Sequence, residues 1–294
     1  MYGKNEKKFQ IFAHICMIII ALCAFLPFLL LIMASFSSNE SIILDGYSLW
    51  PKEFSLEAYA YIWKERLQIF RAYGITLIVT AVGTAAGVII SMLYAYALSK
   101  PKFPGKKFFA FYLFFTMLFN GGLVPTYILF TRYLNLKNTI WALIIPGLLM
   151  SAFNVIIVRT FITGNVPSAL SEAAEIDGAS EYKIFGKIVL PVCKPIIATI
   201  GLFIGVGYWN NWTNGLYYIT DNKLFSIQQL LTNMMKNIEY LSSNTMAATN
   251  TSIDIPSTTV RMAIAVIGIL PILVIYPFVQ KYFVKGIAIG AVKG

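Results

Sequence analysis

Long apolar runs separated by polar segments are the dominant pattern of the chain. A helix needs about 20 apolar residues to cross a bilayer core roughly 30 Å thick, and six runs reach that length. Each is predicted to be a transmembrane helix. The six runs cover residues 9–36, 72–98, 108–130, 139–157, 196–219 and 260–283. The pattern therefore predicts an all-α polytopic membrane protein with six transmembrane helices and one transmembrane domain over residues 1–294.

Three of these runs contain residues that interrupt, bend or narrow a helix. In the third run, Asn120–Gly122 and Pro125 break the apolar sequence, and broken helices at membrane depth usually line cavities. In the sixth run, Pro271 and Pro277 predict kinks. The second run carries small residues at 83–87, which should let a neighbouring helix approach closely.

Basic residues are concentrated in every second polar segment. The N-terminus, residues 99–107, residues 159–194 and the tail at 284–294 hold most of the 23 Lys and Arg residues. The other three loops, of which 37–71 and 221–259 are the longest, hold fewer. Because cytoplasmic loops carry an excess of Lys and Arg, both termini are predicted to be cytoplasmic. The loop at 37–71 is expected to be partly helical.

The composition agrees with a membrane protein and argues against several other classes. The chain is 58% hydrophobic and 12% charged, with a mean hydropathy of +0.71. Its net charge of +10 is expected to set orientation and to face membrane lipid, with no nucleic-acid partner. Cys16, Cys23 and Cys193 form no paired pattern, and His14 is the only histidine, so no metal site is expected. The chain also lacks nucleophile and zinc-protease motifs, which excludes the common membrane enzymes.

The polar segment at 165–192 has the pattern of two short helices joined by a glycine turn. Pro167 suits the start of the first helix, and Gly178 can adopt the left-handed conformation that ends it. A second helix is predicted from about Ser180 and should stop near Pro191. Small residues on the first helix would let it slide into a cleft on a partner, where Glu172 could pair with a basic or amide group.

The spacing within this segment matches a known signature. Glu172-Ala173-Ala174, Gly178 and Ile188-x-Leu190-Pro191 fit the pattern EAA-x3-G-x9-I-x-LP, and the chain therefore resembles the permeases of bacterial ATP-driven importers. The resemblance implies the importer-permease (MetI-like) fold, a location in the bacterial plasma membrane, and a loop that couples ATPase closure to alternating access. Eight residues are assigned to this coupling: Glu172, Ala173, Ala174, Asp177, Gly178, Ile188, Leu190 and Pro191.

The same resemblance implies a set of partners. It predicts a homologous second permease subunit, two ATP-binding subunits and an extracytoplasmic solute-binding lipoprotein. The chain has no Walker A pattern of its own, so it is expected to be non-catalytic and to hold no cofactor. ATP and Mg would be bound by the partner subunits. A passive channel has no use for such a loop.

Several further segments resemble carbohydrate-type permeases similar to the second permease of the maltose importer. They are Leu123–Tyr127, Asn138–Ala142, Ala174–Gly178 and Tyr276–Gln280. The C-terminal residues resemble the Gram-positive branch that imports complex sugars. A saccharide or oligosaccharide is therefore the expected solute, and a peptide, an amino acid or an anion remains the alternative. Away from their ends, the six runs hold no charged residue, which argues against an ion-coupled relay.

A cluster of aromatic and amide residues in the fifth run is the candidate substrate pathway. Indole faces stack on sugar rings, and amides bond to hydroxyl groups. The same residues also fit an aromatic belt at the membrane interface, so both interpretations stay open for Trp212. The pathway candidates are Tyr208, Trp209, Asn210, Asn211 and Trp212, with Asn120, Tyr127 and Asn154 as weaker ones.

Overall fold

The computed structural model describes residues 4–147, 149–243 and 257–291, and most of them are helical. No β-strand occurs within these described ranges. The chain divides into two compact units, which are treated separately below. One unit consists of Met1–Leu67 and Leu231–Pro271, and the other of Gln68–Leu230 and Ile272–Gly294.

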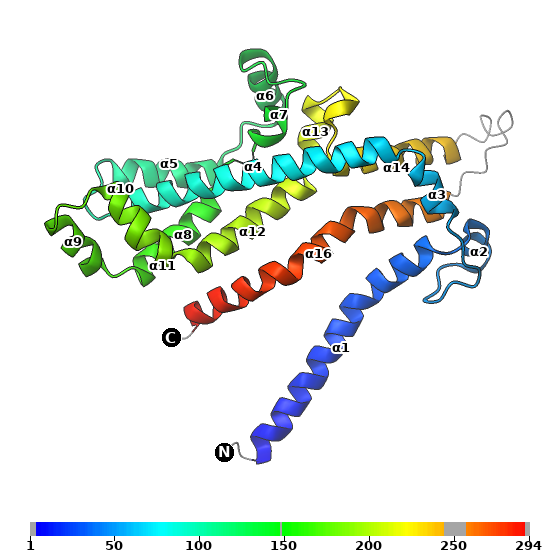
Figure 1. Cartoon of the computed structure of the whole chain (residues 1–294), viewed down its shortest axis with the longest axis horizontal. Helices are drawn as coiled ribbons and strands as arrows, with labels where there is room; N and C mark the ends of the chain where they lie inside the picture. Colours follow the sequence, from blue (N-terminus) through cyan, green and yellow to red (C-terminus); the bar gives the residue numbers. More distant parts are fainter. Residues whose placement is uncertain (1–3, 148, 244–256, 292–294) are drawn as a thin grey trace. The chain divides into compact units, whose positions relative to one another are not determined.

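The first unit begins with a long apolar helix, α1 (Lys4–Ser35), followed by two short helices (Figure 1). The short helices are α2 (Asn39–Asp45) and α3 (Glu57–Trp63), so the predicted helical content of the 37–71 loop is confirmed. The Ser38 side chain caps α2 by accepting a hydrogen bond from the Ser41 amide. Phe36 stacks on Phe54, with 5.5 Å between ring centroids, and this contact helps to fix the loop against the end of α1.

Helices α4 (Arg66–Ser99) and α12 (Lys194–Asn210) pack closely through small residues in the second unit. A Cβ placed on Gly83 would lie 2.3 Å from Cζ of Tyr208, and one on Gly87 would lie 3.2 Å from Cγ2 of Ile204. The space at Gly83 admits only glycine, and the approach at Gly87 is tight for any larger residue, so the predicted close contact of a neighbouring helix is confirmed. Helix α4 therefore has a fixed register against α12.

The third apolar run is broken where the sequence predicted. Helix α5 (Lys106–Leu118) ends before Asn120, and α6 (Leu123–Ile128) starts after Gly122 at a bend of 113°. Gly122 has φ of +83°, a conformation that side chains rarely adopt. A π-helical turn, η1 (Leu129–Tyr133), completes this segment.

The fourth run differs from the prediction of a continuous helix at 139–157. Helix α7 covers only Trp141–Ile144, and α8 (Ala152–Asn165) begins after a non-helical stretch. Pro146 removes a backbone donor, and Gly147 has φ of +73°, so the helix cannot continue through this pair. Helix α8 also extends past residue 157 to Asn165, the first residue of the segment 165–192 that carries the EAA signature (the EAA loop).

The last two runs also differ in detail from their predicted ranges. The fifth breaks after Asn210, and α13 (Thr213–Tyr218) continues it. Next come a 3₁₀ turn, η3 (Asn222–Leu224), and an amphipathic helix, α14 (Ile227–Ser243), which the sequence analysis did not predict. Residues 244–256 of the 221–259 loop lie outside the described residues. Helix α16 (Ser257–Ala291) runs through both prolines and most of the expected tail, and 292–294 are again outside the described residues.

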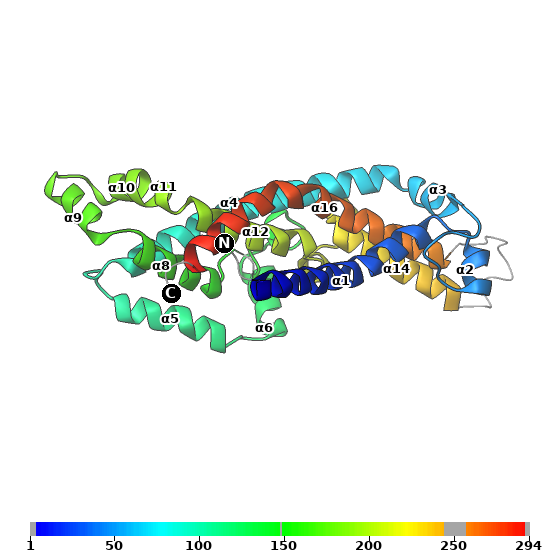
Figure 2. The ribbon, with the colours of Figure 1, turned by 90° about the horizontal axis from the view of Figure 1, so that it is seen from below.

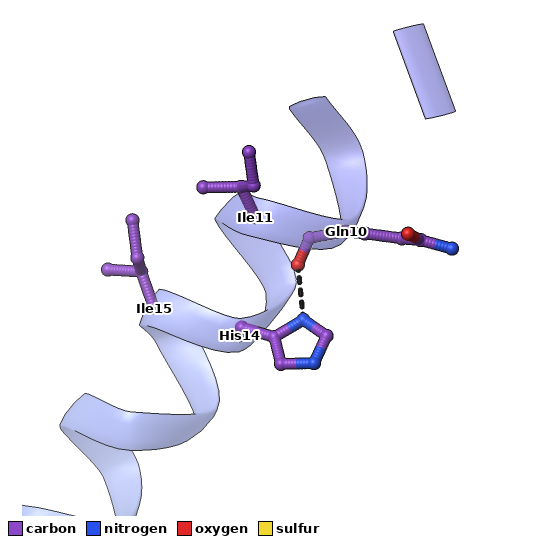
Figure 3. Close-up of a pocket in the computed structure, with 4 residues that line it drawn as sticks. All are labelled: Gln10, Ile11, His14 and Ile15. Carbon is purple, nitrogen blue, oxygen red and sulfur yellow. Dashed lines mark hydrogen bonds between the residues drawn. The ribbon is translucent and has the colours of Figure 1, made fainter. Parts of the chain in front are cut away.

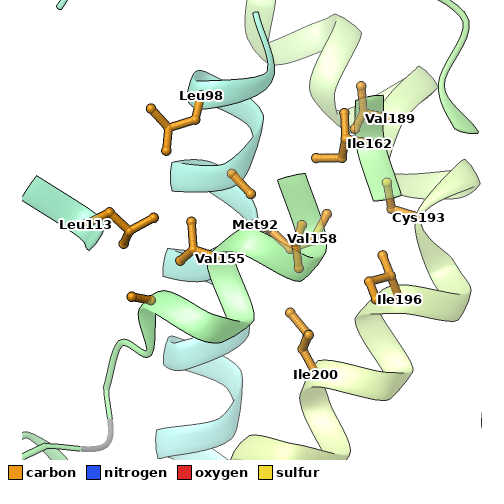
Figure 4. Close-up of a cluster of buried hydrophobic side chains, with 12 residues drawn as sticks. Met92, Leu98, Leu113, Val155, Val158, Ile162, Val189, Cys193, Ile196 and Ile200 are labelled. Atoms are coloured by element: carbon orange, nitrogen blue, oxygen red, sulfur yellow. The ribbon is translucent and has the colours of Figure 1, made fainter. Parts of the chain in front are cut away.

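Buried apolar side chains from α4, α5, α8 and α12 form the core of the second unit (Figure 4). Val155, Val158 and Ile162 on α8 share this cluster with Met92 on α4 and Ile200 on α12. Burial of aliphatic side chains at this density is what holds the helices in one arrangement. The cluster lies next to the point where the EAA loop joins α12.

Two described helices are long and apolar enough to span a membrane by themselves, Lys8–Ser35 and Arg66–Ser99. Three bent pairs of helices would raise the number to five if each pair is one span. Helix α16 also contains an apolar segment, Thr258–Val274. The fold is thus an all-helical membrane architecture.

Candidate functional site

The EAA loop, residues 165–192, forms a helical hairpin at the end of α4 (Figures 1 and 2). Its first arm is α9 (Ser168–Ile176). Its second arm is a continuous run of three short helical segments, which meets α12 at a bend of 82°. These segments are α10 (Glu181–Ile184), the π-helical η2 (Phe185–Val189) and α11 (Leu190–Val192).

The turn between the arms is set by local backbone chemistry. Gly178 has φ of +76°, and its amide donates to the Glu175 carbonyl, while the Ala179 amide donates to the Ala174 carbonyl at 2.9 Å. These two bonds make a Schellman motif, which satisfies carbonyls at the end of α9. The glycine turn and the second helix starting at Ser180 are both confirmed.

The first half of the EAA signature faces outward. Glu172 and Ala173 are exposed, Ala174 is half-buried, and no residue of α9 is buried. Glu172 has no ion-pair partner among the residues the structure describes. Two large apolar side chains, Ile176 and Tyr182, are each 86% exposed at the tip of the hairpin. Exposed apolar groups beside a free carboxylate are typical of a surface that meets another protein.

The second half of the signature anchors the hairpin to the core. Ile188 and Leu190 are half-buried, and Val189 and Cys193 are buried in the cluster drawn in Figure 4. Pro191 lies inside the last helical segment, which ends at Val192, one residue after the proline near which the helix was predicted to stop. The signature therefore combines an outward surface with an inward attachment, and Asp177 and Gly178 form the turn between them.

One lysine connects both arms of the hairpin to α4. The Lys100 Nζ lies 2.9 Å from Glu175 Oε1 and 3.2 Å from Glu181 Oε1, and the Tyr96 hydroxyl donates to the other oxygen of Glu181. Burial lowers the pKa of Lys100, but hydrogen bonds to these three side chains outweigh it and hold the pKa above its usual value. The hydrogen bond from Tyr96 holds the pKa of Glu181 below its usual value. Burial raises this pKa in part, and the contact with Lys100 lowers it further. Sequence reasoning missed this cluster.

Two side chains support the break between α7 and α8: Tyr208 from the aromatic and amide cluster, and Asn214, which lies just after that cluster. The Tyr208 side chain is 2% exposed, and its hydroxyl donates to the Ile144 carbonyl at 2.9 Å. The Asn214 amide donates to the Pro146 carbonyl at 3.0 Å, and the Asn214 backbone amide in turn donates to Asn211 Oδ1. These carbonyls lose their helical partners at the break, so the two side chains satisfy groups that would be costly to bury alone.

The neighbouring residues of the cluster have different environments. Trp209 is 4% exposed, and its Nε1 is buried without a hydrogen-bond partner among the residues that the structure describes. Its ring centroid lies 6.4 Å from that of Tyr73 on α4. Asn210 and Trp212 are exposed. A buried indole N–H without a partner is unusual, because such a group normally finds an acceptor.

The three weaker pathway candidates lie on other elements. Tyr127 stacks on Tyr218, with 5.9 Å between centroids. Asn120 is exposed and accepts a hydrogen bond from the Gly122 amide at the break after α5. Asn154 is buried on α8. The structure thus joins Tyr208, through the break after α7, with Asn211 and Asn214. Tyr127 packs against the hydrophobic cluster that contains Tyr208 and Tyr218, whereas Asn120 and Asn154 lie elsewhere.

A shallow concavity on α1 has the features of a helix surface and no convergent chemistry (Figure 3). It is lined by Gln10, Ile11, His14 and Ile15, all from one helix. The His14 Nδ1 lies 2.6 Å from the Gln10 carbonyl oxygen, one turn earlier. Across the described ranges, no group of three His, Cys, Asp or Glu residues is arranged to hold a metal ion.

Comparisons with known proteins point in one direction. Residues 87–289 match the family described as binding-protein-dependent transport system inner membrane component. The chain is 39% identical to the polygalacturonan/rhamnogalacturonan transport system permease protein YtcP of Bacillus subtilis (strain 168), over 99% of this chain and 100% of the relative. It is 29% identical to the arabinooligosaccharides transport system permease protein AraQ of Halalkalibacterium halodurans, over 94% and 93%.

A solved structure gives the same picture at the level of the fold. A chain from the crystal structure of a bacterial ABC transporter involved in the import of the acidic polysaccharide alginate superposes with a TM-score of 0.78 at 30% identity. The match covers 96% of this chain and 99% of the other. The all-helical architecture is therefore that of a transporter's membrane component.

Proposed function

Because the chain belongs to the family of binding-protein-dependent transport system inner membrane components, we propose that it imports a saccharide or oligosaccharide by alternating access. The observation that carries the coupling mechanism is the EAA hairpin, whose signature residues face outward on α9 while its second arm is held in the core. A rigid arm behind an exposed surface can pass a displacement to the helix that follows it. That helix is α12.

The proposed partners are a homologous second permease subunit, two ATP-binding subunits and an extracytoplasmic solute-binding lipoprotein. The membrane component of a binding-protein-dependent system needs an energy source and a binding protein outside itself. The ATP-binding subunits would hold ATP and Mg and perform the hydrolysis. Glu172, the alanines beside it, Ile176 and Tyr182 would form the surface that contacts them.

The proposed topology has six spans with both termini in the cytoplasm. The distribution of Lys and Arg supports it, because the EAA loop and the 99–107 turn fall on the same basic side as the N-terminus. The pairing of Lys100 with Glu175 and Glu181 is consistent with this placement. Labelling of single cysteines introduced at 102 and 222 with a membrane-impermeant reagent should modify only the second in intact cells. The opposite labelling would overturn the topology.

A saccharide is favoured over a peptide, an amino acid or an anion by the names of the similar proteins, which refer to polygalacturonan/rhamnogalacturonan, arabinooligosaccharides and alginate. The exposed Asn210 and Trp212 supply the amide and indole groups that suit sugar hydroxyls and ring faces. Uptake assays with neutral and uronic acid oligosaccharides, peptides and amino acids would separate these classes. Uptake of a peptide or amino acid alone would refute the saccharide assignment.

The coupling assignment is tested by the double variant Glu172→Ala with Gly178→Pro in the assembled transporter. Removal of the free carboxylate and of the left-handed turn should abolish uptake and weaken association of the ATP-binding subunits, while the permease still inserts. The matched control is Glu57→Ala with Gly46→Pro, an exposed glutamate and a left-handed glycine with open space around it, both outside the loop. Normal uptake with normal ATPase stimulation in the double variant would contradict the coupling role of the hairpin.

A further inference from the structure

The contacts of Lys100 join three parts of the second unit that are far apart in the sequence. Glu175 belongs to the first arm of the hairpin, Glu181 begins the second arm, and Lys100 follows the last residue of α4. The paired residues are separated by at least 75 positions in the chain. The hairpin is covalently continuous with α8 and α12 only, so this cluster is its attachment to a third helix.

The cluster is a network in which Lys100, Tyr96 and Glu181 each have more than one contact. The Lys100 side chain is only 20% exposed and lies over the ring of Tyr96, with Nζ 5.3 Å from the centroid. The same ring packs against Phe185 of the second arm at 5.0 Å. The Lys106 Nζ donates to the Lys100 carbonyl and fixes the turn after α4. Networks of this kind hold geometry better than an isolated surface ion pair, which contributes little.

Because of the turn at Gly178, the two ion pairs of Lys100 connect both arms of the hairpin. Glu175 and Glu181 lie on opposite sides of this turn, so one cation holds the two arms at a fixed angle. A displacement of the hairpin must then either move the end of α4 or break the ion pairs. Helix α4 in turn packs on α12 through Gly83 and Tyr208, and its Gly87 lies against the Leu149 carbonyl at the break before α8.

We infer that Lys100 is a positioning residue that makes α4 move together with the EAA hairpin, so that motion of the hairpin reaches the helix bundle through α4 as well as through α12. This inference rests on the proposed coupling function of the hairpin. It adds an ionic contact with α4 to the covalent connection through α12 and to the apolar contacts of the second arm with the core. Loss of the ionic connection uncouples ATP hydrolysis from uptake and leaves the outward surface of α9 intact.

The test uses the complete transporter in proteoliposomes, with uptake and ATP hydrolysis measured on the same preparation. Lys100→Met should reduce the amount of solute imported per ATP hydrolysed by about three- to tenfold, while the ATP-binding subunits still copurify. Lys100→Arg, which can also bridge two carboxylates, should stay within about twofold of the parent protein. The matched control is Lys102→Met, an exposed lysine of the same turn.

A charge exchange keeps the test decisive if Lys100→Met folds poorly. Lys100→Glu alone should lose coupling, and adding Glu175→Lys and Glu181→Lys should restore a substantial part of it, because the same three positions again attract each other. An unchanged ratio of uptake to hydrolysis in both Lys100→Met and Lys100→Glu would overturn the positioning role. If the Glu172 and Gly178 double variant also has no effect, the coupling function itself is wrong. If only the Lys100 variants have no effect, coupling stands and α12 alone transmits the motion.

Discussion

The EAA hairpin and the aromatic and amide cluster at residues 208–212 were both singled out by their sequences, yet the two regions use their polar side chains in opposite ways. In the hairpin, Glu172 is exposed and has no ion-pair partner in the described part of the chain, and the turn is closed by backbone hydrogen bonds. In the segment 208–214, which extends that cluster to Asn214, the side chains of Tyr208 and Asn214 donate hydrogen bonds to backbone carbonyls at the break between α7 and α8. A polar residue at a surface is available to a partner, whereas one at membrane depth is first required by the backbone.

This contrast gives each region its own expected response to substitution. Changes around the 208–214 segment should affect the free energy of unfolding first, because they disturb buried contacts. Changes on the exposed first arm of the hairpin, α9, should affect association with ATP-binding subunits and leave the free energy of unfolding nearly constant. The three predictions below test this separation, from the largest expected change in stability to the smallest.

The largest effect on stability is expected for Gly83→Ala. The added Cβ would lie 2.3 Å from Cζ of Tyr208, whose ring is buried and fixed by its hydrogen bond to Ile144. Overpacking of this kind costs about 1–3 kcal/mol. Thermal unfolding of the detergent-solubilised protein should show it as a lower transition temperature.

The control for this substitution is on the same helix. Gly74→Ala places its Cβ in open space and should be neutral or slightly stabilising, because alanine favours helix more than glycine. Equal transition temperatures for the two variants would show that α4 and α12 do not pack through Gly83. That result would also remove the support for Tyr208 as a structural residue.

A smaller effect is expected for Asn214→Ala, which removes the hydrogen bond to the Pro146 carbonyl. Hydrogen bonds between membrane helices contribute about 0.6 kcal/mol on average, and an unsatisfied buried carbonyl raises the cost toward about 1–3 kcal/mol. Asn210→Ala, at the exposed end of α12, is the matched control and should leave unfolding unchanged. If Asn210→Ala lowers uptake and Asn214→Ala lowers stability, the two asparagines have separate tasks. The reverse outcome would contradict the contrast between them.

The amount that could be predicted from the sequence depends on how local each feature is. The glycine turn of the hairpin, the start of α9 after Pro167 and the break at Asn120–Gly122 follow from residues adjacent in the chain. The break after α7 has local causes too, in Pro146 and Gly147. It was missed because the surrounding apolar run was long enough to be interpreted as one helix.

The features that escaped prediction are those made between distant residues. Tyr208 and Asn214 meet their carbonyl partners across 64 and 68 residues, and Lys100 meets Glu175 across 75. In the sequence Lys100 is one of several lysines in a short turn, and nothing adjacent distinguishes it. Such pairings depend on the packing of α4 against α12 and on the bend of the hairpin, which the apolar pattern does not determine.

The smallest change in stability is expected for Ile176→Ser at the tip of the hairpin. The Ile176 side chain is 86% exposed, so its loss should alter the free energy of unfolding by less than about 0.5 kcal/mol. It should nevertheless weaken binding of the ATP-binding subunits by about fivefold or more, as for a central apolar residue of an interface.

Ile184→Ser provides the comparison, because that isoleucine is 1% exposed on the second arm. It should destabilise the hairpin by about 2 kcal/mol or more. Titration of the purified permease with ATP-binding subunits, alongside thermal unfolding, measures both quantities. If Ile176→Ser destabilises the protein as much as Ile184→Ser does, the outward arm is part of the folded core, and the distinction between the two regions fails.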